Sequence, residues 1–257
     1  MTKYLDYKLE GKRAIVTGGG TGIGEACAVE LAKGGASVAL FGRREGPLQN
    51  VLEKCRAYSA AMAVPMDVSD EKSVAEAVSK VIGDFGGVDI LINNAGIDRK
   101  VEVGEFRFEK YFGTESAEEY MKYLAVNALG HYLMNNAVIP YMRENHFGRI
   151  VNISSVLALS GFYSTPPYTA SKGASLTQTK AYAQRYGRDG ITVNAILPGM
   201  IDTPMKADSP PEEYDMVKSM TPLGRVGQPL DVAKLALFLC QEDLFITGEG
   251  ISVTGGA

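Results

Sequence analysis

Short apolar runs alternate with longer amphipathic segments along this chain of 257 residues. The runs are rich in valine, isoleucine and alanine, and they are continuously hydrophobic instead of alternating with polar residues. Such runs are typical of strands that are buried on both faces of a sheet. We predict strands at residues 13–18, 37–42, 61–68, 88–96, 148–155, 191–199 and 250–256.

The segments between these runs predict helices, most clearly at residues 22–35, 45–60, 71–87 and 231–241. Alternating strands and helices favour a parallel sheet, because each parallel connection needs a right-handed crossover that packs back onto the sheet. We therefore predict an α/β fold, a single-domain Rossmann-type doubly wound parallel sheet with helices on both faces. No repeat, low-complexity tract or long linker divides the chain, so we expect this domain to span residues 1–257.

Two zones lack clear periodicity, at residues 98–116 and 200–227. Ligands of open α/β sheets bind beyond the carboxyl ends of the strands, and both zones follow predicted strands or their extensions. We expect them to form the walls of a substrate pocket. Their candidate apolar wall and lid residues are Phe106, Phe108, Tyr111, Phe112, Met200, Met205, Met216 and Met220.

The overall composition narrows the possible partners. A net charge of -4 provides no broad cationic surface for nucleic acid or anionic lipid. The N-terminus resembles neither a signal peptide nor a transit peptide, and no stretch reaches about 18 uncharged apolar residues. We expect a cytoplasmic protein with no membrane and no nucleic acid partner.

Cysteine and histidine are scarce. Cys27, Cys55 and Cys240 are odd in number and far apart, which favours buried or inert thiols over a disulfide framework. His131 and His146 are the only histidines, too few for a typical histidine-built metal site. The sequence therefore disfavours metalloenzymes and hydrolases, and we predict no metal.

A glycine-rich turn follows the first predicted strand in the sequence TGGGTGIGEA. Gly18, Gly22 and Gly24 allow a tight turn and a close backbone approach to a pyrophosphate, which the positive end of the following helix favours. The spacing predicts a dinucleotide site, although a glycine-rich strand-to-helix turn that binds no ligand could have the same sequence pattern.

Tyr168 and Lys172 stand four residues apart, so a helix places them on one face about one turn apart. Tyr4 and Tyr214 also have a lysine four residues on, so the spacing alone decides nothing. Only Tyr168 follows an apolar run that ends in serines. This context predicts a chemical role for it.

Several motifs in one order resemble the short-chain dehydrogenase/reductase family, from Gly11 to the end of the chain. TGGGTGIG resembles the family's cofactor turn, NNAG its signature after the fourth strand, and PGMIDT the segment that meets the nicotinamide. The resemblance, with the arginines considered below, implies these cofactor-binding residues: Gly18, Thr21, Gly22, Ile23, Gly24, Arg43, Arg44, Asp67, Val68, Asn94, Ala95, Gly96, Tyr168, Lys172, Pro198, Gly199, Ile201 and Thr203.

The resemblance also implies four catalytic residues, Asn127, Ser155, Tyr168 and Lys172. We prefer Ser155 over Ser154 because it stands thirteen residues before Tyr168, as in the family. Tyr168 would exchange the proton, with Lys172 lowering its pKa, and Ser155 would hydrogen-bond the substrate oxygen. Asn127 would hold a water in a proton relay.

The implied activity is the interconversion of a secondary alcohol and a ketone, with hydride carried by the cofactor. For the substrate we favour a bulky apolar alcohol such as a hydroxysteroid or bile acid. A 3-oxoacyl thioester or a sugar or polyol stays open, and so does a catalytically silent dinucleotide-binding sensor. The resemblance implies a homotetramer, with residues 235–240 and 250–257 in one interface.

The cofactor choice depends on the sequence FGRRE. Gly42 stands where many NAD-dependent members carry aspartate, and Arg43 and Arg44 follow it. A guanidinium suits a 2′-phosphate, which a carboxylate would repel. We predict that NADP(H) is preferred and NAD(H) possible. Thr21, where many NADP-using relatives have a basic residue, and Glu45, a possible ribose ligand, argue against this preference.

Overall fold

The computed structural model describes residues 8–98, 115–161, 164–207 and 209–257. All pairings in its seven-stranded sheet are parallel. The strands are β1 (Arg13–Thr17), β2 (Ser37–Gly42), β3 (Ala61–Pro65), β4 (Ile90–Asn93), β5 (Gly148–Ile153), β6 (Ile191–Pro198) and β7 (Gly250–Val253).

Helices connect these strands and confirm the predicted α/β fold. The longer helices are α1 (Gly22–Lys33), α2 (Glu45–Arg56), α3 (Glu71–Phe85), α5 (Ala117–Leu124), α6 (Gly130–Glu144), α8 (Pro166–Tyr186), α9 (Pro211–Met220) and α10 (Pro229–Leu239). Short helical turns are η1 (Ala125–Leu129), α7 (Leu157–Ser160), η2 (Gly187–Asp189) and η3 (Pro204–Lys206).

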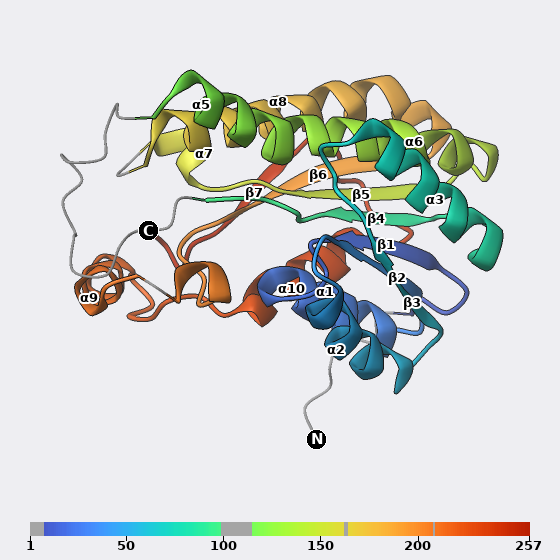
Figure 1. Cartoon of the computed structure of the whole chain (residues 1–257), viewed down its shortest axis with the longest axis horizontal. Coiled ribbons are helices and arrows are strands. Elements are labelled where there is room, and N and C mark those ends of the chain that lie inside the picture. Colours follow the sequence, from blue (N-terminus) through green and yellow to red (C-terminus); the bar gives the residue numbers. More distant parts are fainter. Residues whose placement is uncertain (1–7, 99–114, 162–163, 208) are drawn as a thin grey trace.

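The sheet lies between two helical layers (Figure 1). Helices α1, α2 and α10 cover one face, and α3, α5, α6 and α8 cover the other. Each face has its own apolar core, one around Leu31 and Leu40 and the other around Phe41 and Met134. The sheet is therefore doubly wound, as predicted.

The strand order is β3-β2-β1-β4-β5-β6-β7. The chain builds outward from β1 to β3 and then returns to place β4 on the other side of β1. This reversal of direction between β1 and β4 is the topological switch point, where open α/β sheets bind their ligands.

The predicted burial of the strands on both faces is found at the centre of the sheet but not at its edges. Every residue of β4 and β5 is buried. In β3 only Val64 is buried, and in β7 no residue is. The prediction is wrong for these two strands because an edge strand has a neighbour on one side only.

The predicted strands 61–68 and 88–96 are also longer than β3 and β4. After β4, the backbone N–H groups of Asn94 and Ala95 both donate to the hydroxyl of Thr17, at 2.9 and 3.0 Å. This side chain on β1 draws the two residues out of the ladder. The apolar NNAG run thereby becomes a wall of the site.

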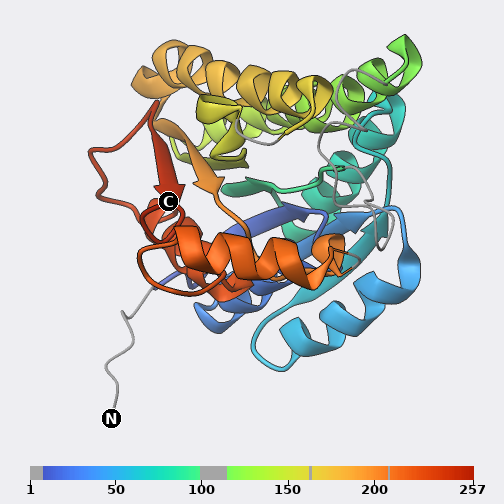
Figure 2. The same ribbon diagram turned by 90° about the vertical axis from the view of Figure 1, so that its left-hand side faces the viewer.

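The chain around residue 200 contains more structure than its irregular pattern suggested. The first turn of helix α9 contains a proline and two acidic residues, which favour the start of a helix. The sequence analysis missed this signal. Figure 2 shows α9 crossing the end of the sheet. The predicted wall residues Phe106, Phe108, Tyr111 and Phe112 lie outside the described residues.

No helix in the described ranges is long and apolar enough to cross a membrane. The three cysteines are free and buried, in keeping with the predicted inert thiols. Burial raises the pKa of Cys27 to about 12 and that of Cys55 to about 11.

Candidate active site

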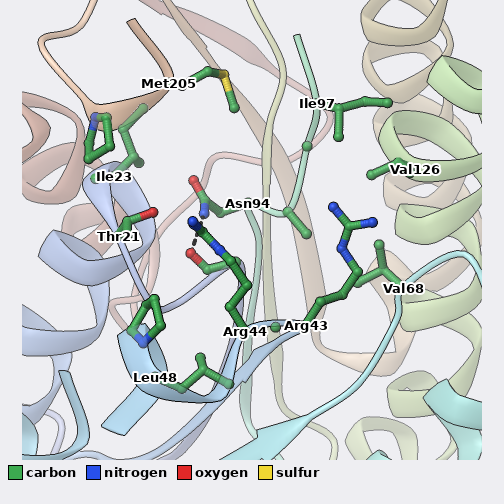
Figure 3. A pocket seen from close by; sticks show the side chains of 18 of the residues that line it. Thr21, Ile23, Arg43, Arg44, Leu48, Val68, Asn94, Ile97, Val126 and Met205 are labelled. Carbon is green, nitrogen blue, oxygen red and sulfur yellow. Dashed lines mark hydrogen bonds between the residues drawn. The ribbon is translucent and has the colours of Figure 1, made fainter. Parts of the chain in front are cut away.

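A cavity of about 450 Å³ opens at the switch point, between the carboxyl ends of β1, β2 and β4. Figure 3 shows side chains from the glycine turn, the end of β2 and the segment after β4 around it. The predicted cofactor residues that line it are Gly18, Thr21, Gly22, Ile23, Arg43, Arg44, Asp67, Val68, Asn94, Ala95, Gly96 and Thr203.

The glycine turn needs glycine for two different reasons. Gly18 and Gly22 have φ angles of 62° and 60°, which other residues rarely adopt. Gly24 does not line the cavity, but a Cβ there would collide with the carbonyl oxygen of Gly18. It lets α1 begin close against the turn, with its free N–H groups at the cavity.

Asn94 holds this turn in place from β4. Its amide Nδ2 donates to the carbonyl oxygens of Thr17 and Gly18, each at 3.1 Å. Together with the bonds that Thr17 accepts, this fixes the glycine turn against the segment after β4. Thr17 is a positioning residue that the sequence analysis missed, because a threonine inside an apolar strand carries no signal of its own.

Arg43 and Arg44 extend from the end of β2 into the cavity (Figure 3). Across from them, burial opposes ionisation of Asp67, but hydrogen bonds from Ser69 and the charge of Arg43 together lower its pKa. The carboxylate is therefore ionised at neutral pH. Glu45, the alternative ribose ligand, is exposed and is not among the lining residues.

A smaller cleft of about 110 Å³ continues from this cavity. The two share Ile23, Asn94, Gly96 and Thr203, so they form one site. Of the predicted residues, the cleft adds Ser155, Tyr168, Lys172, Pro198, Gly199 and Ile201. The tyrosine and lysine come from the first two turns of α8, which begins at Pro166 because proline fits the first turn of a helix.

The two neighbouring serines make different contacts. The Ser154 hydroxyl donates to the backbone oxygen of Lys172 at 2.8 Å and so binds β5 to α8. The Ser155 Oγ accepts from the backbone N–H of Leu157 at 3.2 Å and hydrogen-bonds the Tyr168 side chain. Of the two serines, Ser155 is the one that pairs with the tyrosine.

The electrostatics of Tyr168 differ from the expectation. Burial and the nearby Asp98 carboxylate raise the pKa of the phenol, while the Ser155 hydrogen bond lowers it to a smaller extent. Burial lowers the pKa of Lys172 to about 8, and its Nζ donates to the backbone oxygen of Ile153 at 2.9 Å. The pKa of Tyr168 is therefore raised and not lowered as expected, and Tyr168 holds its proton at neutral pH.

Asn127 lies behind the cleft, in the π-helical turn η1. Its Oδ1 accepts from the backbone N–H of Ile97 at 2.8 Å, and its Nδ2 donates to the carbonyl of Ile97 at 3.0 Å and to Ser171 Oγ at 3.0 Å. A Cβ on Gly96 would approach Asn127 and Lys172 to 3.2 and 3.4 Å. The asparagine therefore joins the segment after β4 to α8.

Two charged residues of the cleft belong to the zones predicted as pocket walls, although the sequence analysis did not single them out. Lys206 Nζ and Asp98 Oδ2 form an ion pair of 3.0 Å, and both side chains line the cleft. Each lies shortly after a family motif, Asp98 two residues after NNAG and Lys206 three residues after PGMIDT. A charged residue close to such a motif was the sequence signal that could have identified both as residues of the site.

A buried histidine was missed as well. His131 Nδ1 lies 2.8 Å from Ser175 Oγ, between α6 and α8. Burial and Lys172 lower its pKa to about 3, so the ring is neutral. No group of three histidine, cysteine or acidic residues able to hold a metal occurs in the described part of the chain.

These groups fit a nicotinamide dinucleotide. The turn backbone and the N-terminus of α1 suit a pyrophosphate, and the arginines suit further phosphate charge. Such a cofactor supplies or accepts a hydride when it is bound. Near Ser155, Tyr168 offers a protonated phenol to a substrate oxygen.

Comparisons with known proteins agree with this site. A family model described as enoyl-(acyl carrier protein) reductase matches residues 18–257. The chain is 36% identical over 255 residues to the 3-oxoacyl-[acyl-carrier-protein] reductase of Aquifex aeolicus, with 98% of this chain and 99% of the relative covered. It is 36% identical over 259 residues to the L-fucose dehydrogenase of Bos taurus, with 98% and 92% covered.

A solved structure is similar over the same length. The crystal structure of 3-ketoacyl-(acyl-carrier-protein) reductase from Brucella melitensis complexed with NADH matches with a TM-score of 0.87 and 35% identity, covering 96% of this chain and 98% of that one. The protein is thus an oxidoreductase that acts on CH–OH or keto groups and uses a nicotinamide dinucleotide. It belongs to the short-chain dehydrogenase/reductase family.

Proposed function

We propose that this protein interconverts a secondary alcohol and a ketone with NADP(H), using Tyr168 as the acid and base. One observation carries the proposal: Ser155, Tyr168 and Lys172 line a cleft that is continuous with the cavity around the glycine turn. A ketone in this cleft would lie between the phenol and the end of the cavity where the nicotinamide would sit.

Each residue has a role in this reaction. Ser155 hydrogen-bonds the substrate oxygen, and Tyr168 donates its proton to that oxygen during reduction. Lys172 supplies the positive charge that favours the phenolate left behind. Asn127 keeps the cleft in shape through Ile97 and Ser171.

NADP(H) is supported by the residues at the end of β2. Arg43 and Arg44 line the cavity, and Glu45 does not. A 2′-phosphate on the adenosine ribose would meet guanidinium groups there, and charge-assisted hydrogen bonds would hold it. NAD(H) lacks this group but keeps every other contact, so it remains a possible cofactor.

For the substrate, different observations support different classes. Met200 and Met205 line the cleft and would suit the hydroxysteroid or bile acid favoured from the sequence. The names of the Aquifex and Brucella relatives favour a 3-oxoacyl thioester, and the name of the bovine relative favours a sugar.

A spectroscopic assay tests the proposal. The loss of NADPH absorbance would be followed with steroid ketones, acetoacetyl-CoA, keto sugars and small cyclic ketones. Turnover of at least one ketone is the expected result. Cofactor binding with no turnover on any ketone would favour the catalytically silent sensor, which has no need of a complete catalytic set.

A further inference from the structure

We propose that the ion pair of Asp98 and Lys206 is the specificity element of the cleft, and that it recognises a hydroxyl group on the carbon next to the reacting one. The substrate class would then be a neutral polyhydroxylated compound, such as a sugar, a polyol or a cyclic diol. This inference rests on the proposed alcohol and ketone chemistry of the same site.

The position of the pair is the first argument. Asp98 follows β4 and Lys206 ends η3, and their side chains meet at 3.0 Å. Figure 3 shows Ile97 and Met205, their neighbours in sequence, on opposite walls of the cavity. The pair therefore bridges the two walls within the cleft that Tyr168 lines.

The distance to the chemistry is the second argument. Asp98 and Lys206 line the same cleft as Ser155 and Tyr168, the two groups that bind the reacting oxygen. The Asp98 carboxylate also raises the pKa of Tyr168. A substrate held by Ser155 and Tyr168 would therefore present the atoms next to its reacting carbon to this pair.

The charge of the cleft is the third argument. Among the described lining residues, Asp98 and Lys206 are the only charged side chains besides Lys172. The pair places an acceptor and a donor of opposite charge side by side, a combination that suits a neutral group able both to donate and to accept a hydrogen bond.

The partial burial of the ion pair favours a hydroxyl over an apolar group as the part of the substrate that contacts it. The Lys206 and Asp98 side chains keep 28% and 17% of their exposure. An apolar ring placed against them would remove the remaining water and return no hydrogen bond, which disfavours binding. A hydroxyl can donate to the carboxylate and accept from the ammonium, so it replaces that water.

The test compares two ketones that differ by one hydroxyl group, 2-hydroxycyclohexanone and cyclohexanone, each reduced with NADPH. The quantity is the ratio of their kcat/KM values, which is independent of the fraction of folded enzyme. In the unmodified protein we expect the hydroxyketone to be preferred. In Asp98→Asn and in Lys206→Met we expect this ratio to fall by about tenfold or more, as for the loss of a charged hydrogen bond to substrate.

Two further variants sharpen the result. Lys206→Arg keeps a positively charged donor, so this variant should keep most of the preference for the hydroxyketone that the unmodified protein shows. Lys218→Met removes a lysine of α9 that is half exposed and pairs with Asp215, and it should leave the ratio unchanged.

The outcomes separate the two proposals. An equal loss for both ketones in the variants, or a preference of the unmodified protein for cyclohexanone or a steroid ketone, would overturn the recognition of a hydroxyl and leave the proposed function intact. No turnover on any ketone, with cofactor bound, would overturn both.

Discussion

At the scale of single residues, side chains that are close in the sequence have different tasks. Ser154 and Ser155 are both buried, yet one bonds the backbone of α8 and the other pairs with Tyr168. Arg43 lines the cavity, while Glu45, two residues on, does not. The roles follow from where each side chain points. Three predictions belong to this scale.

Tyr168→Phe should abolish turnover and preserve cofactor binding, because it removes one hydroxyl and almost no volume. General acid–base groups contribute about 10²- to 10⁴-fold to rate. Stopped-flow or steady-state kcat would measure the loss, and NADPH fluorescence titration would measure binding. More than a tenth of normal kcat would mean that the proton comes from another group.

Ser155→Ala should reduce kcat/KM by about 10²-fold, as when a donor to a developing oxyanion is removed. Ser154→Ala should be milder for catalysis, because its hydroxyl bonds the backbone of Lys172. Parallel kinetic and thermal-unfolding measurements of both variants would separate the two effects. The reverse order in kcat/KM would show that the wrong serine was chosen.

Arg43→Ala should raise the KM for NADPH at least about tenfold and change that for NADH little, because one charged hydrogen-bonding group is lost. Steady-state kinetics with both cofactors would measure this. Equal kcat/KM for the two cofactors in the unmodified enzyme, or a preference for NADH, would contradict the assignment.

At the scale of elements, the cleft lies where the segment after β4, the start of α8 and η3 meet, and η1 lies behind it. The π-helical turn η1 lets Asn127 bond both backbone groups of Ile97, and such turns often occur at functional sites. Between α6 and α8, His131 and Ser175 form a buried polar pair. The stability of this packing depends on pH.

His131 is neutral in the folded protein because its pKa is lowered to about 3 from 6.5. Protonation then favours the unfolded chain, so the free energy of unfolding should fall as pH drops below 6.5 and level off near 3. Between pH 7 and pH 5 this contribution is about 2 kcal/mol.

Urea unfolding of the protein and of His131→Val at these two pH values would measure it. Between pH 7 and pH 5, the free energy of unfolding of His131→Val should fall by about 2 kcal/mol less than that of the unmodified protein. His146→Asn is the matched control, because His146 is exposed and its φ of 49° suits asparagine. The same loss in His131→Val as in the unmodified protein would contradict the prediction.

At the scale of the whole molecule, the reversal of strand order between β1 and β4 creates one continuous site from the glycine turn to Tyr168. The far edge of the sheet has a different character. No residue of β7 is buried, and Phe238 of α10 and Phe245 are 37% and 107% exposed in the single chain. This edge supports the homotetramer that the family resemblance implies.

Light scattering at micromolar concentration should give the mass of the tetramer that the resemblance implies. This edge would form one of its interfaces, because symmetric oligomers cover such an apolar patch with the same patch of a second copy. Phe245→Glu should shift the protein to smaller species. Tyr58→Glu, an exposed aromatic on the opposite half of the sheet, should not. A monomer mass for the unmodified protein would contradict the prediction.

The fold class, the positions of most strands and helices, and the order of the motifs could be predicted from the amino-acid sequence alone. These depend on local patterns, because apolar runs and glycine positions constrain the backbone wherever they occur. Gly18 and Gly22 illustrate this, since their positive φ angles are a local requirement. Predicted residues from motifs that are far apart in the sequence line the cavity. This follows from the order of the motifs along the chain.

The groups that meet across the sheet could not be predicted, because their contacts form only in the folded chain. Thr17 is an ordinary strand residue until β4 lies beside β1 and offers it two N–H groups. Asp98 and Lys206 are 108 positions apart and form a pair only because the ends of β4 and β6 face one site. The raised pKa of Tyr168 likewise depends on burial and on Asp98. Distance and desolvation are properties of the folded chain, and no local pattern carries them.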